Sequence, residues 1–190
     1  MTGCRGTTLV ELLVGTAVGL LVLGACVAGV SSAARLVAAI GARAEAEDTA
    51  QLAVEAFRFD VRRAGYDPTA FGIDALAAAQ SDQLTLHADL DADGVLDGTS
   101  EEVTRWVCAA NPPRLSRVIG AQSLPIAAPV ARCGLVYLDG AGIELLPGAT
   151  GLDAGERSRV RRVRLDLAVA LAGIVDAAAR TMDVALGGRP

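Results

Sequence analysis

Hydrophobic and polar positions divide the chain into an apolar N-terminal part and a mixed remainder. No charged residue occurs between Leu12 and Ala34, a run of 23 residues. At about 1.5 Å per residue, a helix of this length extends roughly 34 Å, which is enough to cross the apolar core of a bilayer. The run therefore predicts a membrane-spanning helix.

The helical pattern continues after the apolar run. Residues 31–65 contain no proline and are rich in alanine, a strong helix former. Apolar residues at spacings of three and four predict one buried face, at Leu36, Ile40, Ala50, Val54, Phe57, Val61 and Ala64. Gly65 and the Asp67-Pro68 pair after it end the pattern. We expect one helix over residues 7–65, membrane-spanning over about 9–34.

Beyond Gly65 apolar and polar residues alternate, which is typical of strands with one buried face. The alternating segments are 83–88, 103–109, 114–119, 133–139, 143–146, 159–171 and 181–186. In the longest segment the outward face would carry Arg162, Arg164 and Asp166. We expect an α+β fold, in which residues 66–190 form a strand-rich globular domain and its antiparallel sheet packs on the amphipathic half of the helix.

Charge and residue usage exclude several classes of function. The net charge is −5, and all 17 basic residues are arginine, so lysine-based catalysis is excluded and general nucleic-acid binding is not favoured. A run of arginines is best explained as a solvated strand face or a partner for acidic residues: Arg157, Arg159, Arg161, Arg162 and Arg164. Because no catalytic or phosphate-binding arrangement is present, we expect neither enzymatic activity nor a small-molecule substrate.

Two of the four cysteines lie in the strand-rich part. Cys108 and Cys133 are each flanked by strand-like residues. A cysteine pair in a domain exported past a membrane is a disulfide candidate. We expect these two residues to be cross-linked, with a pair of buried free thiols as the alternative.

One segment has a pattern typical of ligand chemistry. Asp89, Asp91 and Asp93 lie at alternate positions before Gly94, as in the first half of a calcium-binding loop. Asp97 follows at the position where such loops often bind the ion through a water molecule. Ser100 occupies the twelfth position, where a bidentate glutamate is usual, and Glu101 follows one residue late. The segment predicts either a calcium site that includes Glu101 or an acidic hairpin tip surrounded by water.

The N-terminus resembles that of type IV prepilins. The residues that carry the resemblance are Gly6-Thr7-Thr8-Leu9-Val10-Glu11 and the apolar helix after them. The resemblance implies that residues 1–6 are a leader, that prepilin peptidase cuts between Gly6 and Thr7, and that Thr7 is then N-methylated. Thr7 departs from the phenylalanine usual in the family. Residues 57–68 and the strand-rich domain are similar, more weakly, to PilW-like minor pilins.

The resemblance also implies a fold, a location and partners. We expect a type IV pilin-like fold and a single-pass protein of the bacterial inner membrane, whose C-terminal domain lies outside the cytoplasm and later enters a pilus. Its partners would be prepilin peptidase and other pilin subunits. A carboxylate is costly within a bilayer, and the resemblance implies that Glu11 pairs with the terminal amine of a neighbouring subunit.

Two other functions fit the same segments. A J-type pseudopilin of a type II secretion system would share this N-terminus and a strand-rich domain. A membrane-anchored calcium-binding module would use the acidic loop, and it could be lipidated on Cys26, because Leu23-Gly24-Ala25-Cys26 resembles a lipobox. Against lipidation, Glu11 interrupts the apolar part of such a signal and the apolar run continues past Cys26.

Overall fold

The structure is a computed structural model that describes residues 8–171 and 174–187. Its contacts divide the chain into two compact units, Met1–Ala42 and Arg43–Pro190. The expected leader, residues 1–6, and the expected new N-terminus, Thr7, lie outside the described residues.

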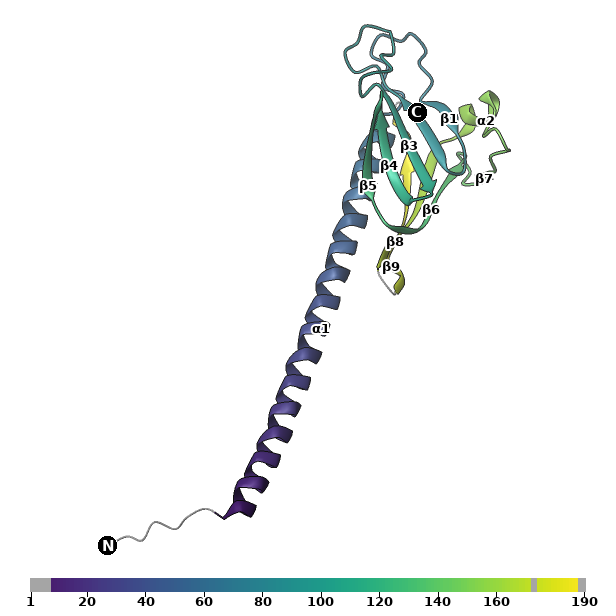
Figure 1. Cartoon of the computed structure of the whole chain (residues 1–190). Coiled ribbons are helices and arrows are strands. Elements are labelled where there is room, and N and C mark those ends of the chain that lie inside the picture. Colours follow the sequence, from purple (N-terminus) through teal and green to yellow (C-terminus); the bar gives the residue numbers. More distant parts are fainter. Residues whose placement is uncertain (1–7, 172–173, 188–190) are drawn as a thin grey trace. The chain divides into compact units, whose positions relative to one another are not determined.

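Helix α1, Leu9–Arg63, is continuous over 55 residues and agrees with the helix expected over 7–65 (Figure 1). By length and composition it is apolar enough to cross a membrane, with a mean hydropathy of 2.3 in its most apolar window. Leu36 and Ile40, expected on the buried face, are exposed. The buried face begins only at Ala46, within the second unit.

The second unit holds nine strands and a short helix among the described residues. The strands are β1 (Leu76–Ala79), β2 (Gln83–His87), β3 (Val103–Ala110), β4 (Pro113–Ile119), β5 (Gln122–Ala127), β6 (Val130–Leu138), β7 (Glu144–Leu145), β8 (Arg162–Leu171) and β9 (Ile174–Ala185), and the helix is α2 (Ala154–Arg159). They form a five-stranded sheet, β1-β2-β3-β4-β5, and a four-stranded sheet, β7-β6-β8-β9. All pairs of neighbouring strands are antiparallel.

The α+β expectation is confirmed, but the prediction of a single sheet is wrong, because the chain changes sheets between β5 and β6. Strands β1 and β5 were not predicted. The start of the expected segment 159–171 also differs, because residues up to Arg159 belong to α2. A capping box fixes the start of α2: the Asp153 carboxylate accepts from the Glu156 amide, and the Glu156 carboxylate accepts from the Asp153 amide.

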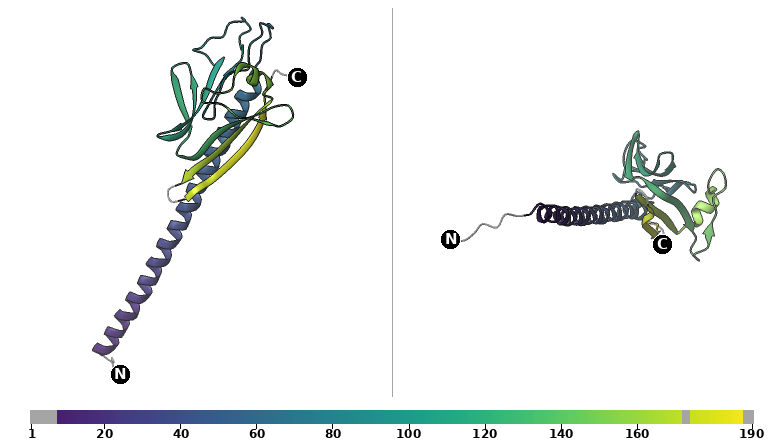
Figure 2. Two further views of the ribbon diagram at one scale, coloured as in Figure 1. Left: turned by 90° about the vertical axis from the view of Figure 1, so that its right-hand side faces the viewer. Right: turned by 60° about the horizontal axis from the view of Figure 1, so that its bottom comes forward.

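The core of the second unit lies where the C-terminal half of α1 meets both sheets (Figure 2). Ala50, Ala53 and Phe57 of α1 are fully buried, and the ring of Phe57 packs edge-on against Trp106 of β3 at 5.3 Å between centroids. From the other sheet, Val163 and Leu165 are fully buried. Burial of each large apolar side chain stabilises the fold by about 1.5–3 kcal/mol, so this shared core holds the helix and both sheets together.

A covalent bond also joins the two sheets. Cys108 of β3 and Cys133 of β6, the pair proposed from the sequence, form a disulfide with their Cα atoms 5.6 Å apart. Hydrogen bonds lie beside it: the Leu135 amide donates to the Ser81 carbonyl, and the Tyr137 hydroxyl donates to the Gln80 carbonyl at 2.6 Å. The turn between β1 and β2 is therefore fastened to β6.

Replacing both Cys108 and Cys133 with alanine should lower the free energy of unfolding of this unit. The bridge closes a loop with a sequence separation of 25, and constraint of the unfolded chain by such a loop corresponds to roughly 3–4 kcal/mol. Trp106, the only tryptophan, is fully buried, so its fluorescence reports unfolding in denaturant. Equal unfolding midpoints for the oxidised wild type and the double variant would contradict a stabilising bridge.

Candidate functional site

Glu11 takes part in the N-terminal cap of α1. The Thr8 amide donates to the Glu11 carboxylate at 2.9 Å, and the Glu11 amide donates to the Thr8 hydroxyl at 3.3 Å. The Thr8 hydroxyl also donates to this carboxylate at 3.2 Å. This reciprocal pattern is a capping box, which satisfies amide groups that a helix start leaves unpaired. The motif Thr8-Leu9-Val10-Glu11 has the spacing of such a box, a signal that the sequence analysis missed.

The N-terminal cap lowers the cost of placing the Glu11 carboxylate in a bilayer. An isolated carboxylate in a bilayer is costly, and hydrogen bonds to it offset part of that cost. Here both the amide and the hydroxyl of Thr8 supply hydrogen bonds within the same helix. The Glu11 carboxylate therefore has hydrogen-bond partners within a single chain.

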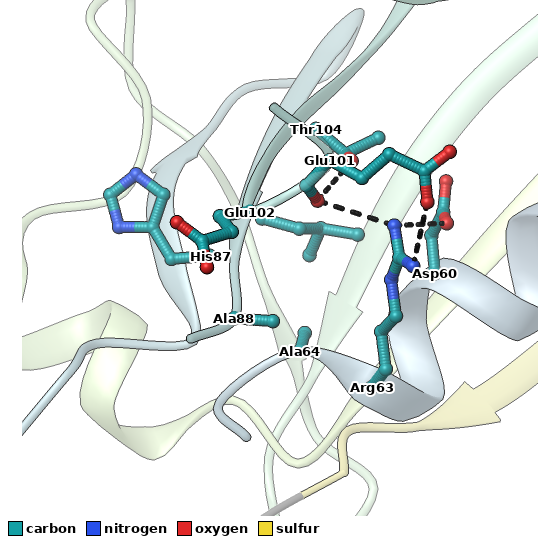
Figure 3. Close-up of a pocket in the computed structure, with 9 residues that line it drawn as sticks. Asp60, Arg63, Ala64, His87, Ala88, Glu101, Glu102 and Thr104 are labelled. Atoms are coloured by element: carbon teal, nitrogen blue, oxygen red, sulfur yellow. Dashed lines mark hydrogen bonds and ion pairs between the residues drawn. The ribbon is translucent and has the colours of Figure 1, made fainter. Parts of the chain in front are cut away.

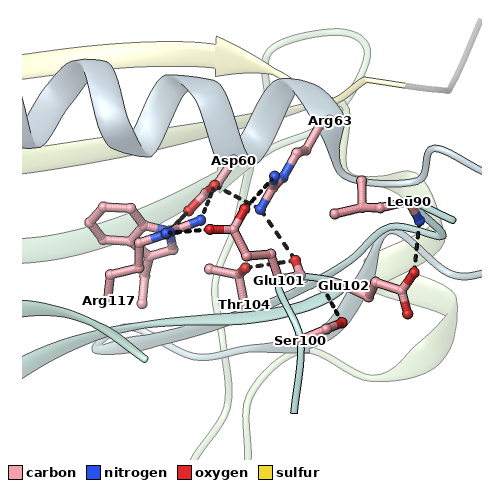
Figure 4. A network of polar contacts seen from close by, with 9 residues as sticks. Asp60, Arg63, Leu90, Ser100, Glu101, Glu102, Thr104 and Arg117 are labelled. Atoms are coloured by element: carbon pink, nitrogen blue, oxygen red, sulfur yellow. Dashed lines mark hydrogen bonds and ion pairs between the residues drawn. The ribbon is translucent and has the colours of Figure 1, made fainter. Parts of the chain in front are cut away.

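At the other end of α1 a buried carboxylate organises a network of charges (Figure 4). Asp60 is 2% exposed. Its two oxygens accept from Nε and Nη2 of Arg117 on β4, at 2.6 and 2.9 Å, and one of them also accepts from the Trp106 indole at 3.0 Å. Arg63, one turn along the helix, lies 3.4 Å from the same carboxylate. The helix is thus tied to β3 and β4 by charge-assisted hydrogen bonds.

Glu101 extends this network toward the acidic loop. Its carboxylate accepts from Arg63 at 2.9 Å and from Arg117 at 3.4 Å. The hydrogen bond from Arg63, together with the nearby positive charge of Arg117, holds the pKa of the Glu101 carboxyl below its ordinary value of 4.5. Glu101 was expected among the calcium ligands, but it pairs with two arginines instead.

Glu102, which was not among the predicted ligands, contacts the acidic loop in place of Glu101. Figure 3 shows the adjacent carboxylates of Glu101 and Glu102 pointing in different directions, the first toward Arg63 and the second away from it. Glu102 is 4% exposed, and its carboxylate accepts from the amides of Asp97 at 2.8 Å and Leu90 at 2.9 Å. Glu101 and Glu102 lie in the turn that precedes β3. Their side chains point in different directions there, so a shift of one residue along the chain exchanges the two roles.

Asp89 is the second buried carboxylate of the loop. It is fully buried, and its oxygens accept from the amides of Ala92 at 2.8 Å and Gly94 at 3.1 Å and from the Thr69 hydroxyl at 3.1 Å. Gly94 has a positive φ of 77°, and a side chain there would collide with the ring of Phe71. A compact turn, closed by its own amides, therefore surrounds Asp89.

The five predicted ligands are only partly brought together. Asp89, Asp91 and Glu102 have ligand atoms within 4.8 Å of one another and could hold a metal ion. Asp93 and Asp97 instead accept from the amides of Val95 at 2.7 Å and Thr99 at 2.8 Å, respectively. The geometry thus supports a smaller oxygen-only cluster, and such ligands suit calcium.

Like charges accumulate at this cluster. The Asp93 amide donates to Asp91 and lowers its pKa, but partial desolvation and the charges of Asp93, Glu102 and Asp89 outweigh it and raise the pKa of Asp91. For Glu102 the amide of Asp97 dominates, and its pKa lies below the ordinary value. Asp91 is therefore the member whose charge the loop accommodates least well.

Two arginines of the run pair with carboxylates outside the acidic loop. Arg164 pairs with Asp183 across β8 and β9 at 2.5 Å, and Arg159 lies 3.7 Å from Asp139. The outward position of Arg162, Arg164 and Asp166 agrees with the strand face expected from the sequence. Next to the loop, Arg63 of α1 and Arg117 of β4 pair with Glu101.

Comparisons with family models, curated proteins and solved structures give no match to this chain.

Replacing Glu101 with glutamine should reduce stability in a pH-dependent way. Because its pKa is lowered in the folded state, Glu101 contributes stability that is present above its ordinary pKa and is lost as pH falls through the lowered value. The carboxylate is half exposed, so we expect a loss of about 1 kcal/mol or less at pH 7 and almost none below pH ~3. Denaturant unfolding at both pH values tests this, and a loss that is equal at both would contradict it.

Replacing Asp91 with asparagine should raise the melting temperature in calcium-free buffer by about 1–3 °C, because it removes like-charge repulsion and keeps the acceptor for the Asp93 amide. In millimolar calcium the wild type should gain stability by mass action if the cluster binds the ion. The matched control is Asp48→Asn, an exposed aspartate of α1. Equal wild-type melting temperatures with calcium and with chelator would leave the loop as a solvated turn.

Proposed function

We propose that this chain is a minor pilin, a structural and non-catalytic subunit used in the assembly or priming of a type IV pilus. The observation that carries the proposal is a single uninterrupted helix, Leu9–Arg63, that starts next to the Gly6-Thr7 pair and has its one early carboxylate at Glu11. A glycine, a glutamate five residues later and an uncharged run of 23 residues coincide here. A strand-rich unit follows the helix, as such a subunit requires.

In this proposal the chain is made as a precursor in the bacterial inner membrane. Prepilin peptidase removes residues 1–6, and Thr7 becomes the methylated N-terminus. The segment over about residues 9–34 spans the bilayer, and the strand-rich unit lies outside the cytoplasm. Other pilin subunits are its partners, and it has neither a small-molecule substrate nor nucleic acid as a ligand.

The Thr8 cap supports a specific role for Glu11 in assembly. Before assembly, Thr8 supplies hydrogen bonds to the carboxylate but no charge. A methylated amine on Thr7 of a neighbouring subunit would add the missing positive charge, which is worth most where water is excluded. The cap thus lowers the free-energy cost of the Glu11 carboxylate in a single subunit. Pairing with the amine of a neighbouring subunit would then make its position stabilising.

A calcium-binding module anchored in the membrane is the second candidate, and the cluster of Asp89, Asp91 and Glu102 favours it. A J-type pseudopilin remains a third candidate, because it would have the same N-terminus. Lipidation of Cys26, which is exposed on α1, would replace pilin processing with removal of everything before that residue.

Intact mass of the chain extracted from membranes tests the proposed processing. We expect a mature chain that lacks residues 1–6 and carries one additional methyl group, and a Gly6→Leu variant should stay uncut. The control is Gly24→Leu, because Gly24 has open space around it and this variant should be cut normally. A chain that begins at a lipidated Cys26 would contradict the proposal.

Glu11→Ala should be cut normally yet be depleted from sheared filaments by about tenfold or more, because a lost charge pair in a water-poor site costs more than 1.4 kcal/mol. Glu11→Gln separates the two roles of the residue, since glutamine keeps the capping box and lacks the charge. Depletion of both variants indicates that the charge matters. Normal incorporation of Glu11→Gln would contradict pairing with an amine.

A further inference from the structure

Two buried polar atoms without a hydrogen-bond partner lie on the face of the five-stranded sheet that is turned away from α1, here called the outward face. In the part of the chain that the structure describes, the buried side-chain atoms without a hydrogen bond are Nε of Arg114 and Oγ of Ser116. Ser116 is only 3% exposed. The two residues are two positions apart on β4, so they share a face. Because buried polar groups are almost always hydrogen-bonded, their coincidence on one face calls for an explanation.

This face is that of β2, β3 and β4 turned away from α1. Its members alternate with buried residues such as Trp106 and Leu115. The register aligns them across the strands: Gln83, Thr85, His87, Val103, Arg105, Val107, Ala109, Arg114, Ser116 and Val118. The set contains two arginines and no carboxylate. Neither arginine has an ion-pair partner among the described residues, and Arg105 is exposed. Although the chain has a net charge of −5, this face is basic.

A hollow of about 190 Å³ lies on this face. Its lining includes Arg105 with Val103 and Val118, and Gly98 and Gly120 come from the adjoining turns. The valines are half-buried. The face therefore combines a shallow apolar depression with an unpaired guanidinium group, and it suits a partner that presents carboxylates beside a small apolar group.

The acidic loop has that chemistry. Asp91, Asp93 and Asp97 are exposed, and Val95 between them is 65% exposed. None of the three aspartates forms an ion pair with Arg105 or Arg114 of the same chain in the described structure. The loop and the sheet face are thus complementary in charge and in apolar character, and among residues 8–171 and 174–187 neither has an ion-pair partner of that kind.

We propose that the outward face of β2, β3 and β4 binds the acidic loop of a second copy of this chain, with Arg105 and Arg114 facing Asp91, Asp93 and Asp97. The contact is head-to-tail, so it leaves one loop and one face free at the ends of a row of subunits. It deepens the proposed function and rests on it, because assembly of a pilus places subunits side by side, copies of this chain among them. Complementary charges set the order and register of such a contact.

Photocrosslinking of the full-length chain in the membranes of cells that produce it tests this contact. A benzophenone amino acid at Ser123, an exposed residue paired with Val118 on this face, should give a covalent dimer in which it is joined to the peptide that contains Asp91 to Asp97. Because Gly98 of the same chain also lines the hollow, an adduct found only within one chain would overturn the contact. The same probe at Ala179, exposed on the four-stranded sheet, is the control and should not capture it. Arg105→Glu should lower the yield about tenfold, because like charges then face each other.

Charge exchange identifies the partner residues. Asp93→Arg should lower the yield as Arg105→Glu does, and a mixture of the two variant chains should restore it. Arg180→Glu, which reverses an exposed arginine of β9, should leave it unchanged. An unchanged yield with Arg105→Glu, an adduct with another protein or with nucleic acid, or no adduct at all would overturn the contact.

Masses of the same samples separate this inference from the proposed function. A mature chain that begins at Thr7 but gives no adduct with the loop would overturn only the contact. A chain that begins at Cys26, or that keeps its first six residues, would overturn the pilin proposal whatever the adducts show.

Discussion

The carboxylate of Asp60 is the constraint on which the arrangement of the second unit depends. It lies on the face of α1 that is otherwise built from alanine, valine and phenylalanine, and it is 2% exposed. An unpaired charge in such a place is strongly destabilising. The guanidinium group of Arg117 and the indole of Trp106 donate hydrogen bonds to it. These contacts require one rotation and one axial position of the helix against β3 and β4.

The acidic loop follows from this arrangement. Arg117 and Arg63, which pair with Asp60, also pair with Glu101, the residue directly before Glu102. Glu102 and Asp89 then close the loop through backbone amides. These contacts extend from Asp60 on α1 to Glu102 at the acidic loop (Figure 4). A change of charge at either residue therefore alters the same polar network. Like-charge repulsion at Asp91 is tolerated because its neighbours are so well hydrogen-bonded.

Local patterns predicted much of the fold, and contacts between distant residues explain what was missed. Helix α1 and most strands follow from periodicity and turn residues. Strand β1, with the sequence LAAA, has no alternation, and β5 contains Pro125, which the strand tolerates at the edge of the sheet. The division into two sheets depends on which strands pair, and local patterns do not determine that. The site was harder still, because Glu101 and Glu102 differ only in the face of the chain to which they point. An aspartate within an apolar helix face was a visible signal for Asp60, and the spacing of Thr8 and Glu11 was a visible signal for the cap.

A double-mutant cycle on Asp60 and Arg117 tests most directly the claim that this pair locks the helix onto the sheet. Free energies of unfolding would be measured through the fluorescence of Trp106 for the wild type, Asp60→Ala, Arg117→Ala and the double variant. Each single variant should lose about 3 kcal/mol or more, because a charge is left unpaired, and the double variant should lose less than the sum by about 1–3 kcal/mol. Additive losses, or single losses within the range of an exposed ion pair, would contradict the claim.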